Sequence, residues 1–277
     1  MAEALGRDAV LRALAEDRAR DDVTTRLLGE ATESPATARF VAEGRFVVAG
    51  VPVVNTVFAE LDPRARVVPG LAEGACCDPS ATIVTVHARA GTLLAGERVS
   101  LNFLQHLSGV ATLTRQAVEA IAGTPARITH TRKTTPGLRA LEQYAVGVGG
   151  GVDNRASLAD AVLWKDNHWA LLAGRPLQAA LKGVQPGLPV VVEIESEAQL
   201  AAALAAGVRH LLVDNQPPER LAAWARRAGP AVTIQASGGI TPQTARAYAE
   251  AGATLIAIGA LTHSAPAVQI RCDIAEI

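Results

Sequence analysis

Two of the three lysines in the chain lie in unusual polar clusters. Of the 26 basic residues 23 are arginines, whereas Lys133 lies in THTRKTTPG and Lys165 lies in LWKDNHW. Lysine presents a compact ammonium that the planar guanidinium of arginine cannot replace. Its use at these two positions, in a chain that mostly uses arginine, indicates that the site needs a compact cation there. Together with Arg132 and Arg155, these lysines predict a site that binds an anionic substrate. Lys182 lies in a bland sequence and is interpreted as solvated.

Two carboxylates and two glycine turns follow short apolar runs later in the chain. Glu193 lies in the run VVVEI, and Asp214 follows LLV. The turns are Ser237-Gly238-Gly239 and Gly259-Ala260, and turns of this kind let backbone N–H groups approach phosphate oxygens closely. These residues predict a phosphate-bearing substrate, with carboxylates that hold Mg²⁺ or stabilise a cationic centre.

Two alternative interpretations of these groups stay open at this point. Glu193 and Asp214 could serve only as partners in buried ion pairs, since such networks also occur without a function. A lysine at a strand end is also typical of Schiff-base aldolases, which makes Lys165 a candidate nucleophile. The adjoining Asp166 and the cluster of cations favour a bound anion over a desolvated amine.

Strands and helices that alternate after Gly123 must position these groups. Short β-rich runs recur roughly every 20 to 35 residues, and helices lie between several of them, with Ser196 and Thr241 as predicted N-caps. The alternation predicts a parallel sheet with right-handed crossovers, either open or closed into a barrel. Polar or glycine residues follow nearly every run, as in barrel enzymes, whose chemistry lies at the carboxyl ends of the strands. The runs are Arg127–His130, Ala161–Trp164, Val190–Ile194, Leu211–Val213, Val232–Ala236 and Leu255–Ile258.

The first part of the chain has a different pattern. Asp8–Arg18 and Ala95–Ile121 carry apolar residues at helical spacing. Within the second of these helices, Ser108-Gly109 predicts a close backbone contact. Three segments mix alternating and continuous apolar runs and are interpreted as strands and connectors. They are Ala38–Ala49, Val51–Phe58 and Thr82–Ala90.

The composition limits the class of protein. The chain has 277 residues, of which 49% are hydrophobic and 19% charged, and a net charge of −1. The high hydrophobic content excludes a disordered protein, and the near-zero net charge excludes a protein that binds nucleic acid through a strong basic field. The apolar stretches Ala198–Val208 and Ala251–Leu261 are shorter than the ~20 residues that span a bilayer, and no secretory signal is visible. Cys76, Cys77 and Cys272 have no metal-binding spacing and are expected to be buried, reduced thiols of a cytoplasmic protein.

The six histidines divide into two groups. Three lie in core-like patterns and are interpreted as structural, namely His87, His106 and His210. Three lie near strand ends and could line a site, without an assigned role, namely His130, His168 and His263.

Eight motifs in a fixed order give the chain a resemblance to a known family. They are GERVSLNFLQHLSGVAT, THTRKTTPGLRALEQYAV, GGGVDNR, LWKDNH, VEIES, VDN, QASGGIT and IGALTHS. The set closely resembles the quinolinate phosphoribosyltransferase family, and DDVTT resembles its N-terminal motif, with Asp21 where glycine is usual. The resemblance covers nearly the whole chain and implies an α/β fold of two domains. These are an N-terminal α/β sandwich over residues 1–108, to which the tail 266–277 returns, and an incomplete, seven-stranded TIM-like barrel over residues 109–265.

The resemblance also implies an activity. The family transfers phosphoribosyl from phosphoribosyl diphosphate to quinolinate with Mg²⁺, which gives nicotinate mononucleotide for NAD biosynthesis, diphosphate and CO₂. It implies a homo-oligomer, a dimer or a hexamer, whose active sites are shared between subunits. It implies no nucleic-acid or membrane partner.

The family's residue roles carry over to matching positions of this sequence. Arg98 corresponds to an arginine that reaches into the neighbouring subunit's site. The groups that bind the substrate carboxylates and the diphosphate correspond to Thr131, Arg132, Lys133, Asn154, Arg155 and Lys165. Glu193 and Asp214 correspond to carboxylates that serve the ribose and the metal and, with Lys133 and Lys165, form the expected catalytic set. The 5′-phosphate cradle corresponds to Ser237, Gly238, Gly239, Gly259 and Ala260.

Two motifs depart from the family pattern inside the expected site. Asn154 stands where the family carries a histidine that helps to hold the diacid, and Asp153 adds an anion beside it. Gln235 replaces a glutamate and so removes a charge. These changes fit either neutral drift or a paralogue that uses a different pyridine or related heteroaromatic acid. A non-catalytic phosphate-binding protein on the same barrel is a third hypothesis, and the retained carboxylates argue against it.

Overall fold

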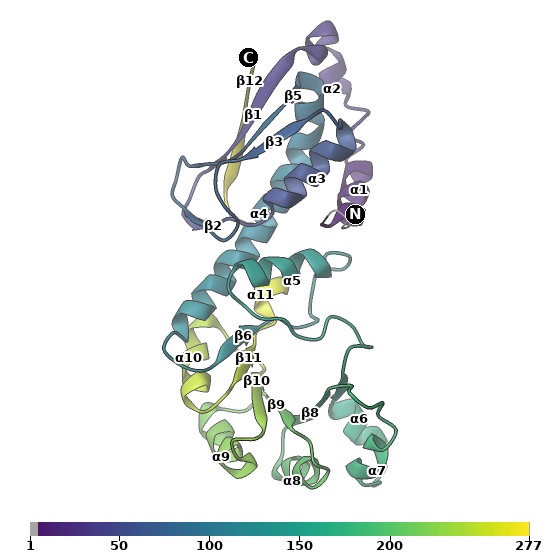
Figure 1. Cartoon of the computed structure of the whole chain (residues 1–277), viewed down its shortest axis with the longest axis vertical. Helices are drawn as coiled ribbons and strands as arrows, with labels where there is room; N and C mark the ends of the chain where they lie inside the picture. The colour runs from purple at the N-terminus through teal and green to yellow at the C-terminus, as the bar shows by residue number, and fades with distance from the viewer. Residues whose placement is uncertain (1–4, 277) are drawn as a thin grey trace. The chain divides into compact units, whose positions relative to one another are not determined.

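The computed structural model describes residues 5–276, which form two compact units (Figure 1). Unit 1 comprises residues 5–115, 134–149 and 262–276, and unit 2 comprises residues 116–133 and 150–261. Unit 1 is built on an antiparallel sheet and unit 2 on a parallel one. The predicted α/β class is confirmed.

The sheet of unit 1 has four strands in the order β12-β1-β5-β3. They are β1 (Pro35–Ala42), β3 (Arg66–Pro69), β5 (Thr82–Arg89) and β12 (Ile270–Glu276), so the last strand of the chain pairs with the first. A small ribbon pairs β2 (Phe46–Val47) with β4 (Cys76–Cys77). The helices that begin in this part of the chain are α1 (Arg7–Glu16), α2 (Val23–Arg26), the 3-10 helix η1 (Gly29–Glu33), α3 (Val51–Leu61), α4 (Ala90–Ala120) and α5 (Arg139–Val148).

Apolar side chains of the sheet and of two helices form the core of unit 1. Phe40 of β1 packs edge-on against Phe58 of α3, with ring centroids 6.5 Å apart. Leu93 and Leu104 of α4 are fully buried in the same cluster. Each such side chain stabilises the fold by roughly 1.5–3 kcal/mol, so α3 and α4 hold the sheet through this core.

The prediction that Val51–Phe58 forms a strand or connector is wrong, because this segment is the first part of α3. Its valines favour a strand when they are judged locally. The helix instead begins after Gly50, whose φ of 108° suits glycine. The carboxylate of Glu73 accepts the backbone N–H groups of Gly50 at 3.1 Å and of Val51 at 2.8 Å. The cap of this helix therefore comes from a residue 22 positions away.

The sheet of unit 2 has six parallel strands in the order β6-β11-β10-β9-β8-β7. Val152 forms a single parallel bridge to Thr129 and marks the place of a seventh strand. Among the described strands, no pairing joins β7 to Val152, so the sheet is open there and the expected incomplete barrel is confirmed. The strands are β6 (Arg127–Thr129), β7 (Val162–Trp164), β8 (Val190–Ile194), β9 (His210–Asp214), β10 (Thr233–Ser237) and β11 (Leu255–Ala257).

Helices connect the strands of unit 2, and Figure 1 shows α8, α9 and α10 on the outer side of the sheet. As predicted, Ser196 caps α8 by accepting the backbone N–H of Gln199 at 3.3 Å, and Thr241 caps α10 with Pro242 in its first turn. Parallel connections of this kind bring the carboxyl ends of all strands to one edge of the sheet. The helices are α6 (Asp166–Leu171), α7 (Leu177–Leu181), α8 (Glu197–Ala205), α9 (Pro218–Ala228), α10 (Pro242–Glu250) and the short α11 (Ala260–His263).

Smaller expectations have mixed outcomes. A Cβ on Gly109 would lie 2.2 Å from the carbonyl oxygen of Pro266, which confirms the close backbone contact. The three cysteines are free thiols, but only Cys77 is buried as expected. Cys76 is exposed, because successive residues of β4 face opposite sides, and Cys272 is only partly buried. Within the described residues, no helix has both the length and the apolar character needed to cross a membrane.

Candidate active site

A cavity of about 580 Å³ lies in unit 2, and its rim is formed by residues at the carboxyl ends of the strands. Lys165 follows β7, Asp214 ends β9 and Ser237 ends β10. The structure thus brings together most of the predicted site residues, from positions distant in sequence. Those that line the cavity are Thr131, Arg132, Lys133, Asn154, Arg155, Lys165, Glu193, Asp214 and Ser237.

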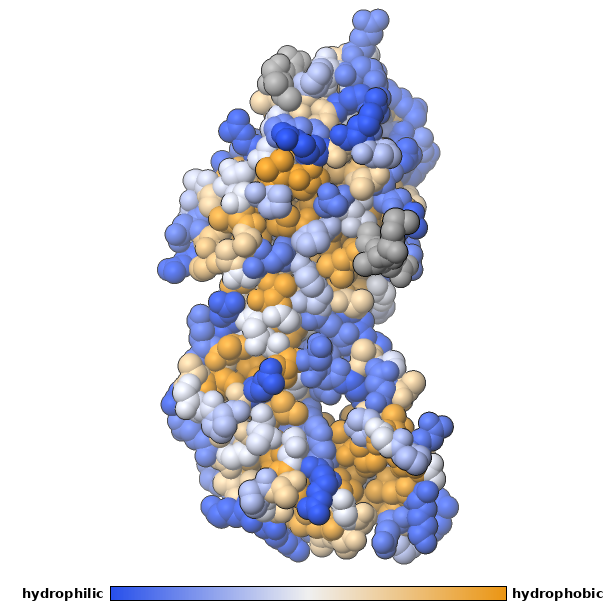
Figure 2. Space-filling model, in the orientation of Figure 1, coloured by the Kyte–Doolittle hydropathy of each residue, from blue (hydrophilic) through white to orange (hydrophobic). Residues whose placement is uncertain are grey.

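The inner part of this cavity is mainly apolar. Alternate residues of a strand face the same side, so Val191 lies below Glu193 on β8 and Leu212 lies below Asp214 on β9. Leu163 of β7 completes this wall. Figure 2 shows orange, apolar surface in the opening beside β8. Charge is therefore concentrated at one end of the cavity and apolar surface at the other.

An ion pair joins Lys165 to Glu193. Nζ of Lys165 lies 2.8 Å from Oε2 of Glu193, whose side chain is only 5% exposed. The indole N–H of Trp169 donates to the backbone carbonyl of Glu193 at 2.9 Å, which ties α6 to β8. Glu193 thus has an ion-pair partner, as one of the two alternative interpretations predicts, but the pair is only half-buried because the Lys165 side chain is 45% exposed. The same contact argues against an aldolase, because Schiff-base chemistry needs an unpaired, neutral amine. Asp214 instead accepts the side-chain amide of Asn215 at 2.7 Å.

Two arginines of the cavity repel each other. The pKa of Arg155 is lowered, first by burial and then by the neighbouring charge of Arg132. Arg155 donates to the carbonyl oxygen of Ala161 at 3.2 Å. The buried Nε of Arg132, in contrast, has no hydrogen-bond partner within the described part of the chain. A buried donor without a partner is costly, so this arrangement favours an anion in the cavity that accepts these N–H groups.

Asn154 is oriented by the backbone at the end of β6. Its side-chain N–H donates to the carbonyl oxygen of His130 at 3.1 Å, and its backbone N–H donates to Nε2 of His130 at 3.2 Å. Burial lowers the pKa of His130, so this imidazole is neutral and accepts at Nε2. Asn154 therefore offers one remaining side-chain N–H to a ligand. The sequence predicts no specific role for His130, although its place directly after β6 indicates that it lies at the edge of the sheet where the site forms.

His210 lies in the wall of the cavity, where the sequence predicted a core residue. Its Nε2 lies 2.8 Å from Oε1 of Gln235, which also lines the cavity. Counting in steps of two along β9 places His210 on the same face as Leu212 and Asp214. That count was available from the sequence, so the core interpretation of His210 is wrong for a recognisable reason.

The two glycine turns lie at the ends of the adjacent strands β10 and β11. Gly238 has a φ of 93°, and a Cβ there would lie 2.2 Å from Oδ1 of Asn215, so the turn requires glycine. Gly239 also has a positive φ, of 61°. Gly259 follows β11 by two positions, and Ala260 begins α11. The proposed phosphate role of both turns stays a prediction, as does the reach of Arg98, which lies on α4.

The carboxylates at this edge fit a divalent cation that brings ligands of its own. The pKa of Glu195 is raised by desolvation and then by the charges of Asp214 and Glu193, which shows that negative charge gathers there. Among the described residues, no group of three or more His, Cys, Asp or Glu side chains could enclose a metal. Mg²⁺ commonly uses one or two carboxylates together with substrate phosphates, and Glu193 and Asp214 match that requirement.

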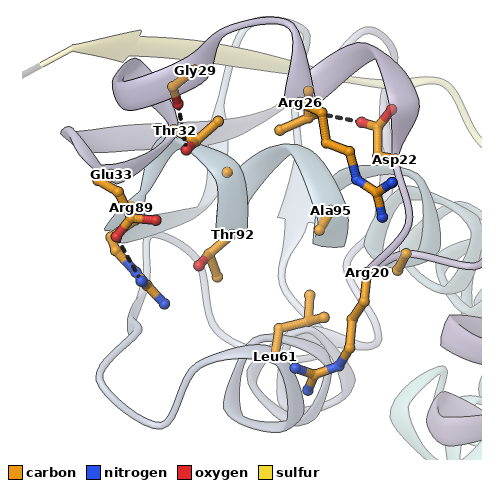
Figure 3. A pocket seen from close by; sticks show the side chains of 13 residues that line it. Arg20, Asp22, Arg26, Gly29, Thr32, Glu33, Leu61, Arg89, Thr92 and Ala95 are labelled. Atoms are coloured by element: carbon orange, nitrogen blue, oxygen red, sulfur yellow. Dashed lines mark hydrogen bonds and ion pairs between the residues drawn. The ribbon is translucent and has the colours of Figure 1, made fainter.

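Unit 1 contains another cavity with arginines, of about 470 Å³ (Figure 3). Arg89 lies 2.8 Å from Glu33 and 3.1 Å from Asp62, and Arg26 lies 3.3 Å from Asp21. A third arginine, Arg20, donates to a backbone carbonyl. These guanidinium groups already have partners in the folded chain, so this cavity does not have the character of an anion site.

Comparisons with known proteins cover nearly the whole chain. Models described as the N-terminal and C-terminal domains of quinolinate phosphoribosyl transferase match residues 22–108 and 110–273. A nicotinate-nucleotide pyrophosphorylase (carboxylating) from Mycobacterium leprae is 40% identical over 97% of this chain and 96% of its own length. A probable enzyme of the same name from Bacillus subtilis is 38% identical over 94% of this chain and 90% of its own. The crystal structure of nicotinate-nucleotide pyrophosphorylase from Ehrlichia chaffeensis superposes with a TM-score of 0.91, at 31% identity, over 99% of this chain and 100% of that one.

Proposed function

The chain belongs to the quinolinate phosphoribosyltransferase family, and we propose that it transfers phosphoribosyl from phosphoribosyl diphosphate to quinolinate with loss of CO₂. The products are nicotinate mononucleotide, diphosphate and CO₂. The observation that carries this proposal is the pair of mutually repelling arginines, Arg132 and Arg155, at the same cavity mouth as the carboxylates Glu193 and Asp214. A planar diacid would neutralise the two arginines, and a ribose that becomes cationic would be stabilised by the two carboxylates.

The arginines position the acceptor. Arginine forks hold carboxylates bidentately, so Arg132 and Arg155 fix the plane of quinolinate and direct its ring nitrogen toward C1 of the ribose. The nitrogen lone pair forms the N–C1 bond while the C1–oxygen bond to diphosphate breaks. A pyridine nitrogen is already a nucleophile, so this step needs no general base.

The carboxylates stabilise the reacting ribose. Positive charge develops on the ribosyl group as diphosphate leaves, and Glu193 and Asp214 are fixed negative groups that stabilise it electrostatically. Lys133 and Lys165 neutralise the leaving diphosphate, and Ser237 with the glycine turns holds the 5′-phosphate. Glu193 and Asp214 would hold Mg²⁺, which would supply further positive charge to stabilise the leaving diphosphate.

Decarboxylation follows from the new charge on the ring. Once its nitrogen is bonded to ribose, the ring is cationic and accepts the electron pair that the neighbouring carboxylate leaves behind as CO₂. A proton from water then replaces the carboxylate. We also propose that the protein is a homo-oligomer in which Arg98 completes the site of a neighbouring subunit.

Two of the three lysines supply a matched test of the proposal. The purified chain is incubated with Mg²⁺, phosphoribosyl diphosphate and quinolinate, and CO₂ and diphosphate are measured. We expect one of each per nicotinate mononucleotide. Lys165→Met should lower kcat by at least about 10²-fold because it removes a cation from the site, whereas Lys182→Met, at an exposed position, should leave it unchanged. Equal rates for the two variants would contradict the assignment.

An altered acceptor is the second candidate function. Asn154 and Gln235 favour it, because both present neutral amides in the cavity where the family carries ionisable side chains. The same assay with a panel of pyridine acids separates the candidates. Turnover of another acid but not of quinolinate supports an altered acceptor, and binding without turnover across the panel supports a non-catalytic binding protein.

A further inference from the structure

A loop at the mouth of the unit 2 cavity is held together by one carboxylate. Residues 153–161 form irregular backbone between Val152 and β7. The backbone N–H groups of Ala156 and Ser157 donate to Oδ2 of Asp160 at 2.9 and 2.7 Å. The hydroxyl of Ser157 donates to the other oxygen of Asp160, Oδ1, at 2.8 Å. Asp160 therefore closes this part of the loop into a ring.

These hydrogen bonds keep Asp160 ionised and occupied. Its pKa is lowered, first by the hydroxyl of Ser157 and then by the backbone N–H of Ser157, with smaller contributions from the N–H of Ala156 and the charge of Arg155. Both oxygens of the carboxylate accept donors from the loop itself. Asp160 thus differs from the other carboxylates of the cavity, Glu193 and Asp214, because its partners are mainly backbone groups.

The ring includes both attachments of Arg155. The backbone of Arg155 directly precedes Ala156, whose N–H binds Asp160. Its guanidinium donates at 3.2 Å to the carbonyl oxygen of Ala161, which directly follows Asp160. The main chain and the side chain of Arg155 are therefore both anchored beside the same carboxylate, and Arg155 and Asp160 both line the cavity.

Arg155 needs such an anchor because its surroundings oppose its charge. Burial and the neighbouring charge of Arg132 lower its pKa, whereas the charges of Asp160 and Glu193 raise it. A repelled, flexible side chain would turn away from Arg132 before a ligand arrives, and its ordering on binding would then weaken the affinity. A guanidinium that is already fixed in its plane binds a carboxylate bidentately without this loss.

We propose that Asp160 is a positioning residue, which holds the loop so that Arg155 keeps its guanidinium ready for a carboxylate of the acceptor. The inference rests on the proposed function, because it takes Arg155 as an acceptor-binding group. Asp160 acts through the backbone of Ala156 and Ser157 and not through its own charge. Its loss should therefore weaken the binding of the acceptor and leave the binding of phosphoribosyl diphosphate unchanged.

Two substitutions separate the hydrogen bonds of Asp160 from its charge. Asp160→Ala removes all three bonds and should raise the KM for quinolinate at least about tenfold, with kcat and the KM for phosphoribosyl diphosphate within about threefold of wild type. Asp160→Asn should keep the KM for quinolinate within about twofold, because its amide oxygen accepts both N–H groups and its amide N–H donates to the hydroxyl of Ser157. Equal KM values for quinolinate in the two variants, or an equal rise in both KM values of Asp160→Ala, would overturn the proposal.

Ser157→Ala supplies an intermediate case. It removes one hydrogen bond to Asp160 and keeps the two from the backbone, so the KM for quinolinate should rise about fourfold. A larger rise than in Asp160→Ala would contradict the proposed ring. If Asp160→Ala does not fold, which its unfolding curve would reveal, the comparison of Ser157→Ala with Asp160→Asn decides, and an equal KM for quinolinate in these two would refute the proposal.

Hydrogen exchange measures the loop without any turnover. Mass spectrometry of peptides that contain Ala156 and Ser157 should show these amides exchanging at least about tenfold faster in Asp160→Ala than in the wild-type protein, and at the wild-type rate in Asp160→Asn. Equal exchange in Asp160→Ala and wild type would mean that Asp160 does not hold the loop. If the wild-type protein transfers phosphoribosyl to no acid, the proposed function fails, whereas the exchange comparison still decides the role of Asp160.

Discussion

The two units place arginines in their cavities under opposite electrostatic conditions. In unit 1 the pKa of Arg89 is raised, chiefly by its hydrogen bond and charge contact with Glu33 and further by Asp62. In unit 2 the pKa of Arg155 is lowered by burial and by Arg132, which together outweigh the opposing effect of Asp160 and Glu193. The surroundings thus stabilise the charged form of an arginine in unit 1 and destabilise it in unit 2. The number of arginines in a cavity therefore does not identify an anion site, whereas their partners do.

The difference indicates what each arrangement is for. Ion pairs within the folded chain, as in unit 1, link elements such as η1 and β5 through Glu33 and Arg89. Cations that repel each other, as in unit 2, oppose folding until a ligand binds them. Unit 1 therefore uses arginine for the fold, and unit 2 holds it ready for a substrate.

The comparison between the two cavities predicts its largest effect on catalysis, when one arginine of each cavity is replaced. Arg132→Met should lower kcat/KM for quinolinate by about 10³-fold, because it removes a preorganised donor from the substrate. Arg89→Met, the matched change in unit 1, should lower it by less than about threefold and reduce the stability of the fold instead. Steady-state kinetics and urea unfolding of both variants check the two expectations. Loss of activity in Arg89→Met with unchanged stability would reverse the assignment of the two cavities.

The next effect is on stability in the presence of an anion. Diphosphate at 100 times its Kd should stabilise the wild-type protein by about 2.7 kcal/mol and raise Tm by about 5–10 °C. Arg132→Met should lose most of this increase, and 1 M salt should reduce it by screening. Arg89→Met should keep the full increase in stability, because the Arg89 guanidinium of the wild-type protein is paired with carboxylates and does not bind diphosphate. Scanning calorimetry measures all four cases, and an equal loss in both variants would remove the distinction between the units.

A smaller effect should follow from restoring the family's histidine. Asn154→His adds a group that can become cationic beside the substrate carboxylates, and we expect kcat/KM for quinolinate to rise by about tenfold. Asn154→Gln, which keeps an amide, is the matched control and should not raise it. An unchanged rate in Asn154→His would mean that the departure at this position is neutral drift.

The sequence alone was sufficient for the parallel half of the fold and for most of the site. The runs that end at Trp164, Ile194 and Ala236 coincide with β7, β8 and most of β10, because buried parallel strands are continuous apolar segments bounded by turns. The polar residues directly after such strands meet at one edge for purely topological reasons. That is why Lys165 and Asp214 could be placed together without a structure.

What the sequence could not supply depends on contacts between distant residues. Helix α3 is capped by Glu73, so no local pattern around Gly50 reveals its start. His130 matters because Asn154 hydrogen-bonds to it from 24 positions away. The carboxylate partners of Arg89 are also distant in sequence, 56 positions away for Glu33 and 27 for Asp62, and for this reason the residue types alone do not reveal how the two cavities differ in their electrostatics.

The smallest expected effect is a pH-dependent change in the stability of unit 1. The pKa of Asp62 is lowered from 3.8 to about 2, mainly by the side-chain hydrogen bond from Arg64 and also by its backbone N–H, with a further contribution from Arg89. Because the folded value is below the unfolded one, this carboxylate stabilises the fold above about pH 4 and loses that contribution as the pH falls toward 2. Asp62→Asn should therefore lower the urea midpoint at pH 7, and most of the difference from wild type should be lost when the pH has fallen to about 2.

The control for this last effect is an ion pair of the same unit that lies in solvent. Asp78 pairs with Arg45 at 3.7 Å, and both side chains are more than three-quarters exposed. Such pairs contribute little to stability at any pH, so Asp78→Asn should leave the urea midpoint nearly unchanged at pH 7 and at pH 2. If Asp62→Asn behaves in the same way, the arginines of unit 1 are not held by their carboxylates. The contrast with unit 2 would then rest on Arg132 and Arg155 alone.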